Sequence, residues 1–150
     1  MTGAVLGIDP GATGAVALLT HDGEALVRDY PGDASQAADL IRDWRMGFRI
    51  ELAAVEAQTA MPKQGVVSMF RLGMNYGSWL GILAGLGIPT LLVKPRQWQA
   101  GVLLKQDGAD TKAQSLAAAR RRWPDLELGL KKHHGRADAL HLARYAKNSR

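Results

Sequence analysis

Two acidic residues follow directly on short apolar segments of the chain. Asp9 interrupts the run VLGIDPGATGAVALL (residues 5–19), and Glu56 follows LAAV (residues 52–55). An unpaired carboxylate buried at the end of a strand costs on the order of several kcal/mol, so each residue needs a compensating partner. Because neighbouring strands lie about 5 Å apart, two strands that end in carboxylates can bring these side chains together.

A third acidic residue, Asp138, lies in the segment HHGRADALHLARYA (residues 133–146). Helical spacing places Asp138 at the edge of an apolar face, with His134 and His141 on its own side. Three gathered carboxylates would repel one another and raise their pKa values unless a cation neutralised them. An all-oxygen ligand set favours Mg²⁺ or Mn²⁺ over zinc. The apolar face expected to turn inward consists of Ala139, Leu142, Ala143 and Ala146.

Each of these residues also has a purely structural interpretation. Asp9 could accept backbone N–H groups of the turn at residues 11–14, Glu56 could pair with Lys63, and Asp138 could cap the last helix. His134, near a helix start in a basic stretch, could be a solvated or capping group. The conjunction of two carboxylates at strand ends with a third on a late helix is what favours a metal site.

The order of the predicted elements supplies a scaffold for these residues. Three strands with a His21-Asp22-Gly23 turn form an antiparallel meander, and a helix capped by Asp33 follows. Pro95 ends the last strand, and Pro124 ends the helix before the final one. This order predicts an α/β fold in a single domain over residues 1–150, with a mixed sheet covered by helices. The expected strands are 4–9, 14–20, 24–30, 52–55 and 90–93, and the expected helices are 34–44, 64–86, 111–122 and 135–147.

Charge divides unevenly along the chain. Residues 1–60 carry a net charge of −5 and residues 61–150 a net charge of +10, within a total of +5. A basic half with scattered aromatic residues favours a nucleic acid as partner, although charge alone also fits an ordinary basic protein. Gln58, Met61 and Phe70, which follow Glu56, could stack near a branch point, although Met61 and Phe70 could also belong to the core. The expected phosphate contacts are Lys63, Lys94, Arg96, Lys105, Lys112, Lys131, Lys132 and Arg136.

Four glycines recur at four-residue intervals in the long predicted helix. They are Gly73, Gly77, Gly81 and Gly85. Each costs about 1 kcal/mol relative to alanine in a helix interior, so the pattern indicates close packing. The packing partner could be the sheet beneath the helix or the same helix of a second copy.

Three motifs together resemble the RuvC-like Holliday junction resolvases, and most closely the shorter phage-type members. The motifs are GIDPGATGAVA, AVEAQTAMPKQGVVSMF and KKHHGRADALHLARYA, and the resemblance extends over residues 4–147. It implies a ribonuclease H-like fold, with a three-stranded antiparallel meander plus two parallel strands in one five-stranded sheet flanked by helices. It also implies a homodimer that binds branched DNA and nicks four-way junctions symmetrically, leaving 5′-phosphate ends.

The resemblance also assigns roles to residues. By position, Asp9, Glu56 and Asp138 match the acidic residues that the family uses to bind two divalent ions, Mg²⁺ or Mn²⁺. The family usually carries a further acid or histidine about one turn before the last Asp. Three residues back is Gly135 and four back is His134, so His134 is the candidate fourth catalytic and metal-binding residue, with His133 as a substitute. No other cofactor is expected.

Other functions remain as alternatives at this stage. An RNA-processing nuclease of the same fold would share Asp9 and the late Asp, and a non-cleaving junction-binding protein would share the basic half. A sugar-kinase-like ATPase needs two such domains, for which 150 residues are too few. The chain has no cysteine and no apolar run of roughly 18 residues, which favours a soluble protein of a reducing cytoplasm, the host cytoplasm if a phage encodes it.

Overall fold

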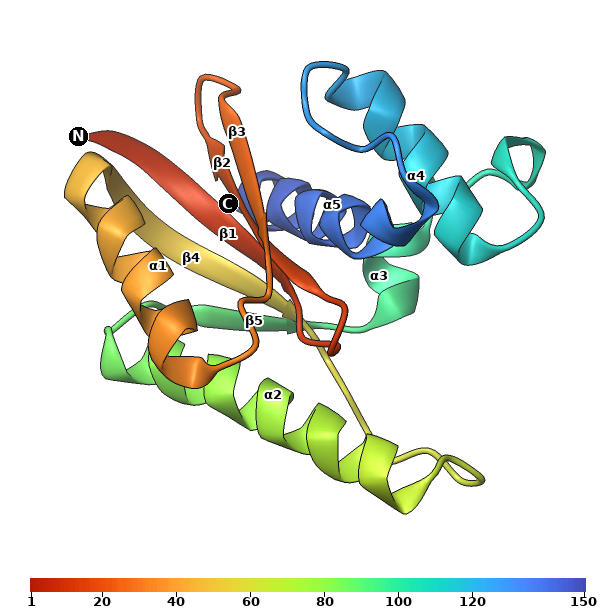
Figure 1. Ribbon diagram of the computed structural model, residues 1–150. Coiled ribbons are helices and arrows are strands. Elements are labelled where there is room, and N and C mark those ends of the chain that lie inside the picture. Colours follow the sequence, from red (N-terminus) through yellow and green to blue (C-terminus); the bar gives the residue numbers. More distant parts are fainter.

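A five-stranded mixed sheet forms the centre of the computed structural model, which describes residues 1–150 (Figure 1). The strands are β1 (Thr2–Asp9), β2 (Ala15–Thr20), β3 (Ala25–Asp29), β4 (Phe48–Glu56) and β5 (Thr90–Val93). Their order in the sheet is β3-β2-β1-β4-β5. β1, β2 and β3 pair antiparallel, whereas β4 lies parallel to β1 and β5 parallel to β4. The predicted meander with two added parallel strands is confirmed.

β4 is longer than the predicted strand at residues 52–55. It begins at Phe48, directly after the first helix, and its first half pairs with the start of β1. Arg49 and Glu51 in this half form an ion pair with each other at 2.8 Å. Because charged residues alternate with apolar ones there, the segment lacks the continuous apolar run by which the buried half was recognised.

The helices cover both faces of the sheet (Figure 1). The predicted helices are all present with small shifts at their ends, but the short α3 was not predicted. Pro95, taken as the end of a strand, is also the first residue of α3, a position that proline tolerates because no N–H is needed there. The bounds are α1 Ala34–Gly47, α2 Val66–Gly85, α3 Pro95–Gln99, α4 Thr111–Arg122 and α5 His134–Asn148, with 3₁₀ turns η1 at Lys105–Asp107 and η2 at Lys131–His133.

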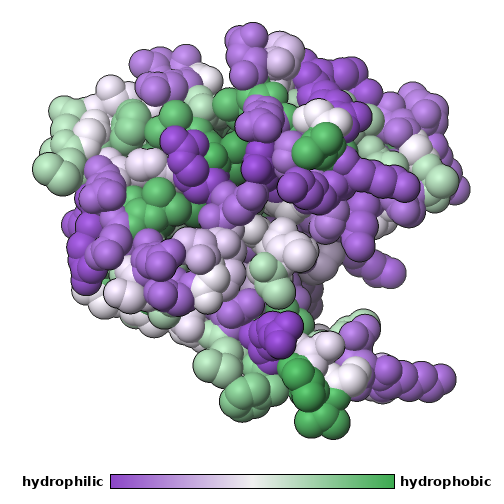
Figure 2. Space-filling view, in the orientation of Figure 1, coloured by the Kyte–Doolittle hydropathy of each residue, from purple (hydrophilic) through white to green (hydrophobic).

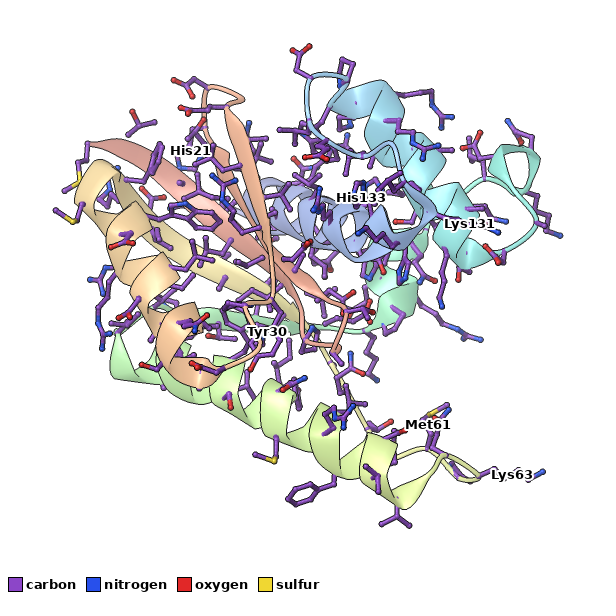
Figure 3. All side chains as sticks on the ribbon, viewed as in Figure 1. His21, Tyr30, Met61, Lys63, Lys131 and His133 are labelled. Atoms are coloured by element: carbon purple, nitrogen blue, oxygen red, sulfur yellow. The ribbon has the colours of Figure 1, made fainter.

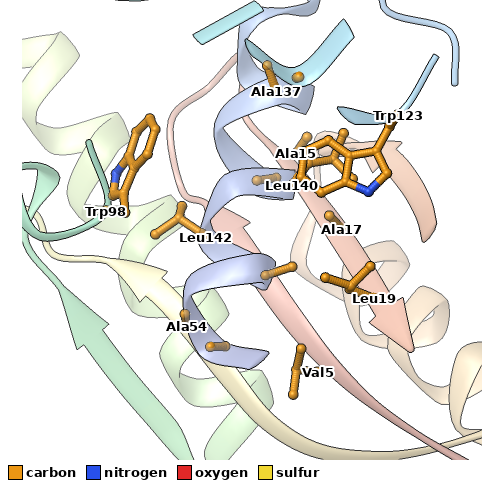
Figure 4. Packing of buried hydrophobic residues seen from close by; sticks show 14 of the residues in the cluster. Val5, Ala15, Ala17, Leu19, Ala54, Trp98, Trp123, Ala137, Leu140 and Leu142 are labelled. Atoms are coloured by element: carbon orange, nitrogen blue, oxygen red, sulfur yellow. The ribbon is translucent and has the colours of Figure 1, made fainter. Parts of the chain in front are cut away.

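Alternate residues of β1 enter two separate cores. Val5 packs in a cluster with α5 and α4 on one face, while Leu6 and Ile8 pack with α1 and α2 on the other. Figure 4 shows the first cluster, in which Trp98 and Trp123 lie on either side of α5. Because both faces are covered, β1 and β2 are apolar apart from Thr2 and Thr20, and only the last residue of β1 carries a charge.

The glycine stripe of α2 faces outward. Gly73, Gly77, Gly81 and Gly85 are all exposed, and a Cβ built on any of them would meet no atom within 4 Å. Packing of the stripe against the sheet, one of its two interpretations, is therefore wrong. The sheet is instead contacted by the opposite face, through the buried Trp79 and Leu83. No helix combines the length and the apolar character that a bilayer span requires.

Candidate active site

Asp9 and Glu56 end two neighbouring parallel strands at the same edge of the sheet. Ile8 pairs with Val55, so the residues that follow them lie side by side. Asp9 accepts a hydrogen bond from the Gly11 N–H at 3.1 Å, and burial raises its pKa. Burial also raises the pKa of Glu56, and the charge of Asp9 adds to this effect. The structure thus brings the first two predicted carboxylates together.

α5 carries Asp138 to the same edge because two glycines let its backbone approach the sheet. A Cβ on Gly7 of β1 would collide with main-chain atoms of Ala139 and Ala143, and a Cβ on Gly135 would collide with the Thr13 carbonyl. Burial, followed by the charges of Asp9 and Glu56, raises the pKa of Asp138 to about 8. The three predicted carboxylates therefore act on one another electrostatically.

Two neutral side chains hold two of these carboxylates in place. The Trp98 indole N–H donates to Glu56 Oε2 at 2.7 Å, and the Ser115 hydroxyl donates to Asp138 Oδ1 at 2.5 Å. His141 joins the two holding residues, since its ring stacks on Trp98 and its Nε2 donates to the Ser115 carbonyl at 2.9 Å. Each acid is thus oriented by a side chain from a different helix.

The donor set fits a hard divalent cation in its chemistry. Asp9 raises the pKa of Glu56, and both raise the pKa of Asp138, whereas Lys112 is the one cation that acts on Asp138 in the opposite sense. As the side chains stand, no three or more His, Cys, Asp or Glu residues are gathered closely enough to hold a metal ion. The hydrogen bonds from Trp98 and Ser115 take up one oxygen of Glu56 and one of Asp138. The predicted ligand roles stay predictions.

The two histidines that precede Asp138 lie in different surroundings. His134 begins α5 and is partly buried, and its pKa is lowered by burial and then by Lys112. His133 is buried, and its Nδ1 accepts the Leu130 N–H at 3.2 Å. His133 therefore serves the entry into α5, which leaves His134 as the candidate fourth ligand. A side chain at position 135 has no room, so the residue three before Asp138 must be glycine here.

Lysines gather near the start of α4 and the start of α5. Lys112, Lys131 and Lys132 are exposed and line, with His134, a hollow of about 520 Å³ between α4 and α5. Lys63 lies on the loop before α2, on the far side of a recess from Lys131 (Figure 3). Figure 2 shows this recess between the protruding start of α2 and the lobe that contains α4. The remaining predicted cations, Lys94, Arg96 and Lys105, are also exposed.

Arg136 differs from the other predicted phosphate contacts. Its guanidinium forms a two-pronged ion pair with Asp29 at 2.8 and 2.9 Å and donates to the Glu127 carbonyl at 2.9 Å. Its side chain is 19% exposed. Its donors fasten α5 to β3 in the free chain, and the DNA contact of Arg136 stays a prediction.

Three supporting residues were not identified from the sequence. Trp98 was noted only as one of several aromatic residues, His141 only for its position beside Asp138, and Ser115 not at all. A tryptophan five residues after the end of β5, the strand next to β4, is the one usable signal, since α3 must begin near the strand ends. The roles of Ser115 and His141 depend on the packing of α4 against α5, for which the sequence carries no comparable pattern.

Comparisons with known proteins bear on this site. Over 98% of this chain and 94% of the other, the structure superposes on Thermus thermophilus RuvC in complex with a Holliday junction substrate, with a TM-score of 0.64 at 20% identity. A second RuvC structure from the same organism gives a TM-score of 0.59 at 21% identity, covering 97% of this chain and 95% of that one. The chain has the fold of RuvC. The predicted ribonuclease H-like architecture is thereby confirmed.

Similarity in sequence leads to the same group of proteins. The chain is 38% identical over 94 residues to the chloroplastic Holliday junction resolvase MOC1 of Chlamydomonas reinhardtii. The match covers 61% of this chain and only 10% of the length of that relative. No family model matches the chain. The resemblance to RuvC-like resolvases that the three motifs predicted is confirmed, while its phage-type detail stays a prediction.

Proposed function

We propose that this chain is a divalent-metal-dependent endonuclease that nicks four-way and other branched DNA. The observation that carries the proposal is the group of Asp9, Glu56 and Asp138 at one edge of a RuvC fold, with the lysine-lined hollow between α4 and α5 on the side of Lys112 and His134. The similarity to a resolvase, in a protein that is otherwise much longer, supports a branched-DNA substrate. A protein that only binds DNA gains nothing from buried carboxylates that raise one another's energy near its binding surface. The presence of three such acids therefore favours cleavage.

Asp9, Glu56 and Asp138 would hold the ions, with His134 as the fourth ligand. Two divalent ions bound there would supply water activation and neutralisation of the leaving 3′-oxygen in an in-line displacement that leaves a 5′-phosphate. Trp98 and Ser115 fix the directions of Glu56 and Asp138. Lys112, which acts electrostatically on Asp138, would bind a non-bridging oxygen of the scissile phosphate.

Neutral imidazole is a poorer ligand for Mg²⁺ than a carboxylate is, so a site that includes His134 should work at least as well with Mn²⁺ as with Mg²⁺. His134→Asp should therefore shift the ratio of cleavage rates towards Mg²⁺. Rates measured over a concentration series of each ion test this. An unchanged ratio would remove His134 from the ligand set.

The outward face of α2 supports a homodimer. At 100° per residue, the four glycines of the stripe lie on the same side of α2 as the exposed Val66, Val67, Phe70 and Met74. An apolar face without side chains at its centre lets two helix backbones approach across a two-fold axis. Two copies joined there would carry two sites, as paired nicks require.

The start of α2 has the properties of a junction contact. Phe70 is 70% exposed and Met61 is 56% exposed, so their assignment to the core is wrong. Gln58, two residues after Glu56, donates to its Oε1 at 3.3 Å. Exposed apolar side chains beside the recess are suited to stacking on bases that are unpaired at a branch point.

Cleavage of an immobile four-way junction tests the proposal against a matched linear duplex and a splayed fork, with Mg²⁺ or Mn²⁺. We expect paired nicks in the junction, none with Asp9→Asn, and full activity with Asp43→Asn, which removes an exposed acid from α1. Binding without nicks would instead identify a non-cleaving junction-binding protein. Preferential cutting of an RNA substrate of the same geometry would identify an RNA-processing nuclease.

A further inference from the structure

A second cationic hollow lies on the other side of α4 from the lysine-lined one. Two adjoining hollows, of about 470 and 320 Å³, share Val102, His141 and Arg144 in their walls. Together they form a groove along the later turns of α5, bordered by α4 and by the segment from α3 to residue 104. We call it the α5 groove.

No acidic residue lines the α5 groove. Its polar lining consists of arginines and neutral hydrogen-bonding groups, namely Gln97, Arg121, Arg122, Arg144, Asn148 and Ser149, with His141 and Tyr145 beside them. Arg121 is neutralised by a two-pronged ion pair with Asp107 at 2.9 and 2.7 Å. Arg122 and Arg144 have no hydrogen-bond or ion-pair partner.

Two unpaired guanidinium groups on one groove are electrostatically unfavourable. Burial, and then the charge of Arg122, lowers the pKa of Arg144, and no carboxylate offsets this effect. The basic end of α4 is in part explained by the helix dipole, which favours cations near the last turn. This explanation does not account for Arg144, which lies on α5 and faces the same hollow as Arg122.

One wall of the groove contacts Glu56. The stacked rings of Trp98 and His141 form part of its wall, with centroids 5.6 Å apart. The indole N–H of the same Trp98 donates a hydrogen bond to Glu56. A strand that passes the carboxylates and continues around this wall would thus enter the groove with its phosphates beside Arg122 and Arg144.

We propose that the α5 groove binds backbone phosphates of a DNA arm that extends from the cleavage site. Guanidinium groups match the oxygens of a phosphate through paired hydrogen bonds, and neutral amide and hydroxyl donors complete such contacts. The proposal rests on the proposed function for the origin of the strand, but the groove would bind the backbone of any duplex. Its effect is therefore measurable without cleavage.

The test compares the wild type with the double variant Arg122→Gln, Arg144→Gln, and with a control of equal charge change, Arg28→Gln, Arg42→Gln. Both control residues are exposed and lie on β3 and α1. Affinities for a four-way junction and for a linear duplex are measured in EDTA over a series of salt concentrations. Each lost phosphate contact lowers the slope of log affinity against log salt by about 0.9, so the groove variant should lose about 2 from the slope and roughly tenfold in affinity.

Equal slopes for the groove variant and the control would overturn the proposal. Arg122→Glu, at an exposed position, provides the same test should the double variant fail to fold.

Inorganic pyrophosphate is a further probe of the α5 groove. If it raises the melting temperature of the wild type but not of the groove variant, while DNA binding is unchanged, the groove takes a free phosphate and the DNA assignment is wrong. A wild type that binds with the groove-dependent slope but cuts no junction would refute the proposed function and leave the groove standing.

Discussion

Replacing Asp138 with asparagine should stabilise the folded chain while it abolishes cleavage. Burial and the charges of Asp9 and Glu56 raise the pKa of Asp138 from 3.8 to about 8. The folded state therefore holds more protons than the unfolded state between these values, and the free energy of unfolding falls as the pH rises through this window. Each pH unit above 3.8 costs about 1.36 kcal/mol, so the acid costs up to about 4 kcal/mol at pH 7 relative to a neutral side chain of the same shape.

The expected gain is smaller than this limit, because the buried amide of asparagine also costs desolvation. We expect Asp138→Asn to raise the free energy of unfolding by about 2 kcal/mol or more at pH 7.5 without divalent ions. Asparagine can still accept the hydrogen bond from Ser115, so the local packing is kept. The pH dependence between 6.5 and 8.5 should become flatter in the variant than in the wild type.

Urea unfolding in EDTA at pH 6.5, 7.5 and 8.5 measures these differences, with Asp43→Asn as a control for the loss of an exposed acid. Added Mg²⁺ should then stabilise the wild type, since an ion that binds only the folded state shifts the equilibrium by mass action, and should stabilise Asp138→Asn far less. A variant that is no more stable than the wild type in EDTA, or that keeps its pH slope, would refute the view that these three carboxylates strain one another.

Three further predictions concern other parts of the molecule. Trp98→Phe keeps an aromatic ring for His141 to stack on but loses the hydrogen bond to Glu56. The Mn²⁺ concentration for half-maximal cleavage should therefore rise about tenfold. An unchanged Mn²⁺ titration would contradict this role of Trp98. His141 is buried with its pKa lowered from 6.5 to about 4, so the unfolded state binds the proton more readily than the folded state. Between pH 7 and pH 5, urea unfolding should therefore show the wild type losing about 2 kcal/mol more stability than His141→Gln. Equal losses would contradict the lowered pKa. Gly81→Leu should leave the monomer folded, because a Cβ there meets no atom, yet should convert a dimer to monomers in light scattering, and a dimer that persists would place the interface elsewhere.

The parts of the site that were predictable are those fixed by local pattern. Asp9 breaks an apolar strand, and a charge at that point in a two-sided sheet has few structural explanations. Glu56 follows the same rule on the neighbouring strand. Asp138 was found because helical spacing and the motif coincided. These three residues depend on strand ends and helix phase, which a single sequence reveals.

The sequence is least informative where a distant residue decides the outcome. Arg136 stands in a basic run, yet Asp29, 107 positions earlier, takes up its charge. The α2 glycines suggested either of two partners, and only the placement of Trp79 and Leu83 on the opposite face shows that the sheet is not one of them. Ser115 and Trp98 acquire their roles from acids on other elements. The spacing of residues along the chain does not predict such contacts between distant elements.

The contacts at Gly7 and Gly135 have a consequence for how this protein can vary. The separation of the backbones that carry Asp9 and Asp138 is set by main chain resting on main chain, without intervening side chains. Substitutions that alter the volume of leucines or alanines elsewhere in the core can shift neighbouring helices without moving this pair apart. The separation of Asp9 and Asp138 should therefore persist while core residues are exchanged. Substitutions of the two glycines themselves should be tolerated least.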